Sequence, residues 1–158
     1  MRGTYCLLIK VKKEGLMKVG SLGRIKFKRG IYIYVGSAMN GIEKRVARHV
    51  REKKRKFWHI DYLLGSKNTY IEKVFYREGS KGECKVARSF AKDAEPVEKF
   101  GCSDCNCVSH LFRLKKNLSV MSAAITRNYY GHFRELGADE LHCLSGNGEI
   151  SEEYESSL

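Results

Sequence analysis

Three residues in the first third of the sequence have the types and spacing that phosphate chemistry needs. Tyr34 lies two residues before a glycine, and Arg45 and His49 follow at a separation of one helical turn. Residues four apart project from the same side of a helix, so the guanidinium and the imidazole are expected to lie together. A guanidinium can hold two phosphate oxygens, and a nearby cation lowers the pKa of a phenol. Core packing of Tyr34 with a hydrogen-bonded hydroxyl is the alternative.

Glu83 is the acidic residue best suited to hold a divalent cation. It shares helical spacing with Val86, Ala87 and Phe90, so it falls on an expected apolar stripe, where an unpaired carboxylate is costly. One carboxylate, completed by phosphate oxygens and water, is a usual way to hold Mg²⁺, and Mn²⁺ is the other candidate. A capping box formed by Ser80 and Glu83 explains the same residue without chemistry.

A dense group of cysteines near residue 105 is a candidate zinc site. Thiolates and imidazoles are the preferred ligands of zinc. The four candidate ligands are Cys102, Cys105, Cys107 and His110. Their spacing is compact and lacks the distant second pair of an ordinary zinc ribbon, so buried thiols beside a structural histidine are the alternative. The other cysteines are interpreted as core or incidental residues: Cys6, Cys84 and Cys143.

The charge of the chain indicates a polyanionic partner. Its 158 residues hold 30 Lys and Arg against 18 Asp and Glu, a net charge of +12. Residues 1–114 hold 26 of those cations and 11 of the acids, so the basic surface is expected there. No apolar run approaches the roughly 20 residues of a membrane span, and the N-terminus lacks a cleavage-site pattern. Charge alone suits DNA, RNA or an anionic membrane surface as the partner. Because no span or signal peptide is found, we expect a cytoplasmic protein that is not a membrane protein.

The elements that must position these residues can be read from periodicity. Alternating apolar residues predict strands at 5–9, 31–35 (ended by Gly36), 70–76 and 107–114, with a hairpin of 16–19 and 24–27. Helical spacing predicts helices at 41–54 (capped by Asn40), 58–64 and 119–130. Another helix is expected to follow the capping box at Ser80 and to carry Val86, Ala87 and Phe90 on its apolar stripe. This order is typical of an α+β domain over residues 1–114, with a small antiparallel or mixed β-sheet flanked by helices. Residues 115–158 are expected to be an extension with a helix and a disordered acidic tail.

Several of these segments together resemble one nuclease family. Tyr34-Val35-Gly36 resembles the second signature of the GIY-YIG nucleases, and Gly3-Thr4-Tyr5 resembles the first, with Thr in place of Ile. More narrowly, the sequence resembles the Uri-type branch, which also occurs fused to endonuclease-III-like repair glycosylases. The resemblance spans about residues 3–112 and is carried by the order and spacing of Gly3–Tyr5, Gly30–Ala38, Arg45–His49, Trp58–Leu63, Glu83–Cys84 and Phe100–Phe112.

The resemblance implies a GIY-YIG-like fold and a metal-dependent DNA endonuclease with a role in DNA repair or processing. The implied catalytic residues are Tyr5, Tyr34, Arg45, His49 and Glu83, with Glu83 as the ligand of Mg²⁺ or Mn²⁺. The residues expected to contact the substrate are Arg24, Lys26, Lys28, Ser37, Arg48 and His59.

Two departures from the family pattern support a rival hypothesis. Tyr5 and Tyr34 are 29 residues apart, a longer gap than in the wider family, which makes the hairpin between them an insertion. Ser37 stands where DNA-repair members often have a Lys, so Arg24, Lys26 or Lys28 would have to supply that charge. The rival is a nucleic-acid-binding adaptor with weak catalysis, stapled by zinc, that serves a DNA-repair protein partner.

Overall fold

Segments rich in β-branched and aromatic residues form the strands of this protein, and amphipathic segments form its helices. The computed structural model describes residues 1–52, 54–115 and 133–144. Within those ranges the elements are, in chain order, β1 (Gly3–Val11), β2 (Gly15–Lys18), η1 (Gly20–Leu22), β3 (Arg24–Phe27), β4 (Gly30–Ala38), α1 (Ile42–Val50), α2 (His59–Leu64), β5 (Thr69–Glu78), α3 (Glu83–Phe90), β6 (Glu95–Pro96), β7 (Leu111–Arg113), β8 (Arg134–Glu135) and α5 (Ala138–His142).

The larger sheet has six strands in the order β6-β7-β4-β1-β5-β8, and all its pairings are antiparallel. Its longest pairings join β1 to β4 and β1 to β5, so β1 lies between two long neighbours. β2 and β3 pair with each other as a separate hairpin. With the helices of the described residues this is an α+β fold with an antiparallel sheet, as the sequence predicts.

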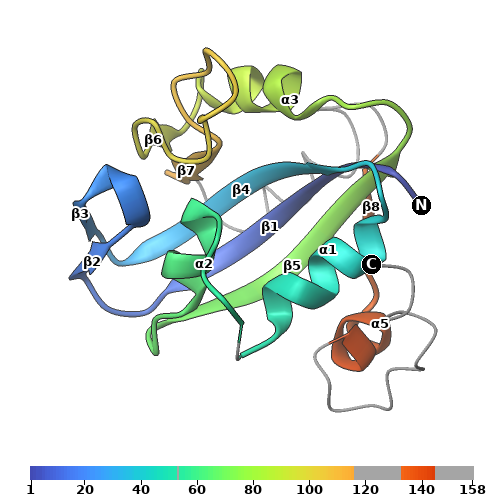
Figure 1. The fold of residues 1–158 in the computed structure, drawn as a ribbon, viewed down its shortest axis with the longest axis horizontal. Helices are drawn as coiled ribbons and strands as arrows, with labels where there is room; N and C mark the ends of the chain where they lie inside the picture. Colours follow the sequence, from blue (N-terminus) through green and yellow to red (C-terminus); the bar gives the residue numbers. More distant parts are fainter. Residues whose placement is uncertain (53, 116–132, 145–158) are drawn as a thin grey trace.

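Each face of the sheet has its own apolar core, because side chains alternate along β1. One face buries Tyr5, Leu7 and Ile9 against α1 and α2. The opposite face buries Cys6 and Leu8 against α3. Figure 1 shows α1 and α3 on opposite sides of the strands. We call these the α1 face and the α3 face, and the position of a residue along β1 or β4 decides which helix it meets.

The start and end of α1 differ from the prediction of a helix at 41–54 capped by Asn40. Gly41 occupies the cap position with a φ of 129°, and no side chain caps the helix. The N–H of Ile42 donates instead to the carbonyl of Met1, 2.7 Å away. The helix ends at Val50 because Arg51 is extended. A contact with the chain terminus, which local sequence does not encode, therefore replaces the expected cap.

The expected capping box before α3 is also wrong. Gly82 lies at the cap position without a side-chain hydrogen bond, and Glu83 is the first helical residue. In a capping box the Glu would stand three residues inside the cap. The carboxylate of Glu83 is therefore free to serve another partner.

Two strand boundaries needed correction as well. β4 continues through Gly36 to Ala38, where β1 still pairs with it. The strand expected at 107–114 shortens to Leu111–Arg113, and residues before it form turns. The two-residue strand β6 beside β7 was not expected.

The C-terminal part contributes to the same sheet. β8 pairs with β5 through Phe75 and Tyr76, and α5 follows it. The helix expected at 119–130 and the acidic tail lie outside the described residues. None of the helices in the described ranges is long and apolar enough to span a bilayer.

Candidate functional site

Tyr5 and Tyr34 come together from neighbouring strands on the α1 face. Tyr5 pairs with Gly36 and Leu7 pairs with Tyr34 in the register of β1 and β4, so the two phenols are diagonal neighbours. Their ring centroids are 6.4 Å apart. The long sequence gap between them does not prevent this approach, because the inserted hairpin leaves the pairing of β1 and β4 intact.

Gly36 allows the ring of Tyr5 to lie across β4. A Cβ at this position would be 2.5 Å from both the Cζ and the hydroxyl oxygen of Tyr5. Real Cβ atoms do not approach heavy atoms so closely, so a larger residue would displace the ring. Gly36 therefore has a packing role here and does not end the strand.

His49 connects this pair of strands to α1. Its Nε2 lies 2.7 Å from the hydroxyl oxygen of Tyr5, and its ring centroid lies 6.1 Å from that of Tyr34. Tyr5 and His49 are 1% and 2% exposed, whereas Tyr34 is only half-buried. The Nδ1 atom of His49 is buried and has no hydrogen-bond partner within the described residues.

Burial sets the protonation of this cluster. It raises the pKa of Tyr5 well above its usual value, and the charge and hydrogen bonding of Arg45 oppose the rise. Burial also raises the pKa of Tyr34, again opposed by Arg45. Burial lowers the pKa of His49 to about 3, and the charge of Lys54 adds to that effect. At neutral pH both phenols are protonated and His49 is neutral.

Sequence reasoning missed the part that Trp58 plays in holding Arg45. The guanidinium carbon of Arg45 lies 4.3 Å from the centroid of the Trp58 ring, and that of Arg48 lies 4.1 Å from it. Stacking of this kind restrains a guanidinium without using its N–H donors. A single Trp that follows a basic run was the visible signal.

Arg48, a candidate substrate contact, is engaged inside the protein. Its two terminal nitrogens lie 2.7 and 2.8 Å from the carboxylate oxygens of Asp61, which is 1% exposed. Asp61 also accepts the backbone N–H groups of Phe57 and Trp58, and together these contacts lower its pKa against the effect of burial. Arg48 therefore anchors the segment that carries Trp58.

Ser37 and Glu83 lie on the other face of the sheet. Ser37 pairs with Thr4 in the β1–β4 register, and its side chain therefore points opposite to those of Tyr5 and Tyr34. Its hydroxyl donates a hydrogen bond to the carboxylate of Glu83, and the Lys81 ammonium lies 3.3 Å from that carboxylate. The structure thus divides the sequence-predicted catalytic set between the α1 face and the α3 face.

The two groups still influence one another electrostatically. Behind the larger effect of burial, the charge of Glu83 raises the pKa of Tyr34. Gly36, which stands between Tyr34 and Ser37 in β4, has no side chain that could separate the two groups further. Thr4, the cross-strand neighbour of Ser37, has a buried hydroxyl without a partner among the described residues. A Cβ at Gly82, which directly precedes Glu83, would lie 3.3 Å from this hydroxyl oxygen and 2.9 Å from a guanidinium nitrogen of Arg77.

The basic residues in and just after β3 lie toward the end of β1 that is far from Tyr5. Lys26 and Lys28 form exposed ion pairs with Glu14 and Glu95, at 3.7 and 3.5 Å, and Arg24 is exposed. The hairpin starts beyond Val11, six residues from Tyr5, which corresponds to about 20 Å along a strand. These cations are therefore available to a long polyanion but are not neighbours of the tyrosines.

His59 lies next to the loop that leads to the cysteines. Its Nδ1 accepts a hydrogen bond from the backbone N–H of Gly101, 2.9 Å away, and burial lowers its pKa. Gly101 has a φ of 72°, and a Cβ there would approach His110 at 3.2 Å and Tyr34 at 3.4 Å. The loop therefore packs tightly against both the tyrosine side and the cysteine side.

Four soft ligands gather beside this loop, but they are not quite the predicted four. The Sγ atoms of Cys84, Cys105 and Cys107 and a ring nitrogen of His110 lie within 4.8 Å of one another. The Sγ of Cys102 instead donates to the carbonyl of Phe100, 3.3 Å away. Cys84, which the sequence reading treated as incidental, takes its place because the start of α3 folds against the loop. The cluster could bind a metal such as zinc.

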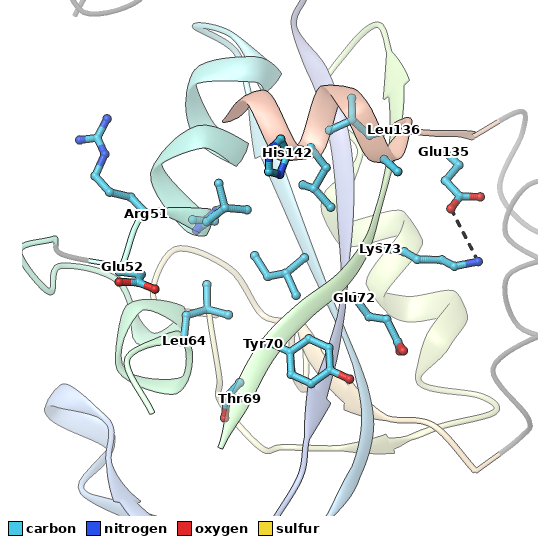
Figure 2. Close-up of a pocket in the computed structure, with 15 residues that line it drawn as sticks. Arg51, Glu52, Leu64, Thr69, Tyr70, Glu72, Lys73, Glu135, Leu136 and His142 are labelled. Atoms are coloured by element: carbon cyan, nitrogen blue, oxygen red, sulfur yellow. Dashed lines mark ion pairs between the residues drawn. The ribbon is translucent and has the colours of Figure 1, made fainter. Parts of the chain in front are cut away.

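A cavity of about 620 Å³ lies behind His49, between the end of α1, β5 and α5. Figure 2 shows Leu64 and Leu136 among its walls and the ion pair of Lys73 with Glu135 at its edge. Neither tyrosine of the cluster lines it. His49 is the residue that this cavity shares with the tyrosine cluster.

Comparisons with known proteins add a family but no named relative. The family model described as "Domain of unknown function DUF123" matches residues 4–130. No curated protein and no solved structure matches the chain.

Proposed function

The chain belongs to the DUF123 family, and we propose that it is a metal-dependent endonuclease with a GIY-YIG-like fold that hydrolyses phosphodiester bonds of DNA. The observation that carries the proposal is the convergence of Tyr5, Tyr34, Arg45 and His49 on one face of the sheet. These four side chains come from β1, β4 and α1 and combine proton-transfer groups with a restrained guanidinium. Core packing alone does not call for a cation among buried phenols.

The two tyrosines have different parts in this proposal. Tyr34 is half-buried, so its hydroxyl is the one that meets the attacking water. Tyr5 is buried and its hydroxyl lies at hydrogen-bond distance from the Nε2 of His49, so it can give its own proton to the imidazole. That step would turn a neutral phenol and a neutral imidazole into a phenolate and an imidazolium, which together carry no net charge, and this limits the cost of forming them in a buried place.

Arg45 supplies the positive charge that phosphoryl transfer needs. Its charge lowers the pKa of both Tyr5 and Tyr34 against the effect of burial. It would also hold the non-bridging phosphate oxygens as negative charge develops on them. Trp58 keeps the guanidinium oriented before the substrate arrives, so less ordering is needed at the moment of reaction.

Glu83 would hold the divalent cation, with the hydroxyls of Ser37 and Thr4 close to it. Bound Mg²⁺ or Mn²⁺ would supply Lewis-acid stabilisation of the phosphate and the leaving oxygen. Lys81 is exposed, so its ammonium can move away from the carboxylate at little cost. Glu83 would therefore be an oxygen ligand next to Ser37 of β4, one residue beyond Gly36.

DNA is the polyanion that this charge distribution suits. The exposed cations of β3 lie about 20 Å along β1 from Tyr5, a distance that a duplex or a long single strand can span. Phosphate contacts of this kind give affinity without sequence preference and weaken with salt. We assign the protein to DNA repair or processing on the resemblance to the Uri-type branch, and a repair protein is the partner that this role implies.

A catalytically weak adaptor is the second candidate, and one observation favours it. Glu83 lies on the face opposite to the tyrosines, and its carboxylate is already engaged by Ser37 and Lys81. In that case the α1 face would bind nucleic acid and the cysteine cluster would provide the structural staple.

Cleavage of labelled DNA separates the two candidates. Purified protein is mixed with single-stranded, duplex, nicked and flapped DNA, with Mg²⁺, Mn²⁺ or EDTA, and with matched RNA. We expect metal-dependent cleavage of at least one DNA substrate and its loss in Tyr34→Phe and Arg45→Ala. Binding of every substrate by the wild type without any cleavage would establish the adaptor instead.

A further inference from the structure

The cysteine cluster connects parts of the chain that are distant in sequence. Cys84 is the second residue of α3, whereas Cys105, Cys107 and His110 belong to the loop that leads into β7. We propose that these four side chains bind one zinc ion, and that this ion fixes the first turn of α3 and with it the carboxylate of Glu83. The part concerning Glu83 rests on the proposed nuclease function, whereas the zinc site does not.

The spacing of the ligand atoms fits one tetrahedral ion. The Nε2 atom of His110 lies 3.7 Å from the Sγ of Cys84 and 3.5 Å from the Sγ of Cys105. An ion about 2.3 Å from each sulfur and about 2.0 Å from the nitrogen holds ligand atoms roughly 3.5 to 3.8 Å apart. All four atoms lie within 4.8 Å of one another, so only small rotations are needed to complete the tetrahedron.

The chemistry of the ligands selects zinc over the cation proposed for Glu83. Thiolates and imidazole favour zinc, whereas Mg²⁺ and Mn²⁺ prefer oxygen ligands. Four protein ligands leave no open position for substrate or water, which is typical of a structural zinc site. The two metals would therefore occupy separate places and have separate roles.

The backbone around His110 is prepared for such a role. Its N–H donates to the carbonyl of Phe100, 2.8 Å away, and its carbonyl accepts the N–H of Val35, 2.9 Å away. Val35 lies in β4, so the histidine is tied to the central sheet before any ion binds. The ion would then link this fixed ligand to Cys84 on a helix whose start has no side-chain cap.

Glu83 directly precedes Cys84, so a zinc ion bound to Cys84 would also affect the position of Glu83. A ligand fixed at Cys84 restrains the backbone of Glu83 and aims its carboxylate toward Ser37. Without the ion, the first turn of α3 is held by the apolar contacts of Val86 and Ala87 further along. Glu83 is thus a metal-binding candidate whose position depends on a second metal, and Cys84 is a positioning residue.

Zinc content is the direct test of the site. The full-length protein is purified with and without added zinc, and metal is measured by plasma mass spectrometry for wild type, Cys84→Ser, Cys105→Ser and Cys102→Ser. Cys102 is the matched control because it lies in the same loop but outside the cluster. We expect one zinc per chain in wild type and Cys102→Ser, and loss of zinc in both other variants. Absence of zinc from every sample, or equal loss in Cys102→Ser, would overturn the proposal.

Cobalt substitution tests the site in the wild-type protein, so its result does not depend on whether the cysteine variants fold. Co²⁺ added to zinc-free wild-type protein is expected to give the absorption bands of a tetrahedral thiolate site, and zinc is expected to abolish them. Spectra without these bands, or a disulfide among these cysteines that lowers the thiol count of the denatured metal-free protein, would contradict a zinc site. Neither readout requires nuclease activity.

The positioning role needs two further measurements. Hydrogen exchange of the amides in the first turn of α3 is expected to accelerate when zinc is removed, while exchange in α1 stays unchanged. Cys84→Ser is expected to need a higher Mg²⁺ concentration for half-maximal cleavage, whereas Cys102→Ser is not. Unchanged exchange in α3 would refute the positioning role even if the protein cleaves no DNA, and a complete lack of cleavage by wild type would count against the nuclease proposal alone.

Discussion

The two faces of β4 hold polar clusters that are stabilised in different ways. On the α1 face, the Tyr5 hydroxyl and the Nε2 of His49 form a neutral hydrogen bond in a buried place, while the Nδ1 of His49 has no partner among the described residues. On the α3 face, the carboxylate of Glu83 relies on a hydroxyl and an exposed ammonium. The first cluster contains its own cation, the Arg45 guanidinium, whereas the second offers oxygen ligands that favour a bound one.

This difference explains how one short strand segment can serve two tasks. Tyr34 and Gly36 point to the α1 face and Ser37 points to the α3 face, because strand side chains alternate. Tyr5 and His49 are thereby kept in a dry, preorganised place, while the carboxylate of Glu83 has a half-buried hydroxyl and an exposed ammonium as its neighbours. The comparison predicts that substitutions on the α3 face change metal dependence, and that substitutions on the α1 face change stability and pH dependence.

The largest effect is expected from Glu83→Gln, which keeps the shape of the side chain but removes its charge. Loss of a metal ligand should lower the single-turnover cleavage rate by roughly 10³-fold, equivalent to about 4 kcal/mol. DNA binding measured in EDTA should stay within about twofold of wild type, because no contact on the α1 face changes. Glu98→Gln, at an exposed position, is the control. An equal loss of rate in both variants would contradict a metal-binding role of Glu83 on the α3 face.

A stability effect of about 3 kcal/mol is expected for Arg48→Ala. The substitution leaves the carboxylate of Asp61 buried without its ion-pair partner, and the partial exposure of Arg48 keeps the cost at the low end for a buried pair. Urea unfolding monitored by the fluorescence of Trp58 measures it. The double variant Arg48→Ala, Asp61→Ala should recover part of the loss, since no charge is then left alone. A single variant as stable as wild type would show that this pair does not anchor Trp58.

Gly36→Ala should destabilise the protein by about 2 kcal/mol, because the added methyl group meets the ring of Tyr5. The double variant Gly36→Ala, Tyr5→Leu should lose less than the sum of the two single changes. Thermal unfolding of the four proteins completes a double-mutant cycle. Gly15→Ala is the control, since no atom lies within 4 Å of a Cβ there. Additive effects of the two substitutions would show that ring and glycine do not interact.

The smallest predicted effect, counted per pH unit, is a change in the pH dependence of stability. The pKa of His49 is lowered to about 3 in the folded protein, and it is about 6.5 in the unfolded chain. The unfolded state therefore binds the extra proton first, so stability falls as pH drops below about 6.5, by at most about 1.4 kcal/mol per pH unit.

Urea unfolding at several pH values between 7 and 4.5 compares wild type with His49→Gln. The variant should be less stable at pH 7 but should lose less stability on acidification. Parallel profiles of the two proteins would mean that His49 is not held neutral by burial.

The sequence was most informative where local pattern decides structure. The run from Ile31 to Val35 is β-branched and aromatic, and it lies in β4 as predicted. The helical spacing of Ile42, Val46 and Val50 predicted α1, which spans these residues. Tyr34 and Ser37 are three residues apart, and an odd separation places two side chains on opposite faces of one strand. The sequence therefore already implied that Ser37 faces away from Tyr34, and Glu83 is the residue that Ser37 meets there.

The parts that escaped prediction depend on contacts between distant segments. Asn40 is a good cap by type, but the carbonyl of Met1 takes its place. Cys102 has good spacing to the other loop ligands, but Cys84 reaches the cluster from α3. Sequence spacing within a loop says nothing about which cysteine arrives from another element, so a ligand set could be proposed but not completed.

The most direct test of the central claim is the single-turnover cleavage rate of wild type, Arg45→Lys and Arg51→Lys on labelled DNA with Mg²⁺. Lysine keeps the charge but loses the paired donors of the guanidinium, and Arg51 is the matched control at the exposed end of the same helix. We predict metal-dependent cleavage by wild type, a loss of roughly 100-fold in Arg45→Lys and little change in Arg51→Lys. Wild-type protein that binds DNA but does not cut it with Mg²⁺ or Mn²⁺, or cleavage by Arg45→Lys at the wild-type rate, would contradict a catalytic site on the α1 face.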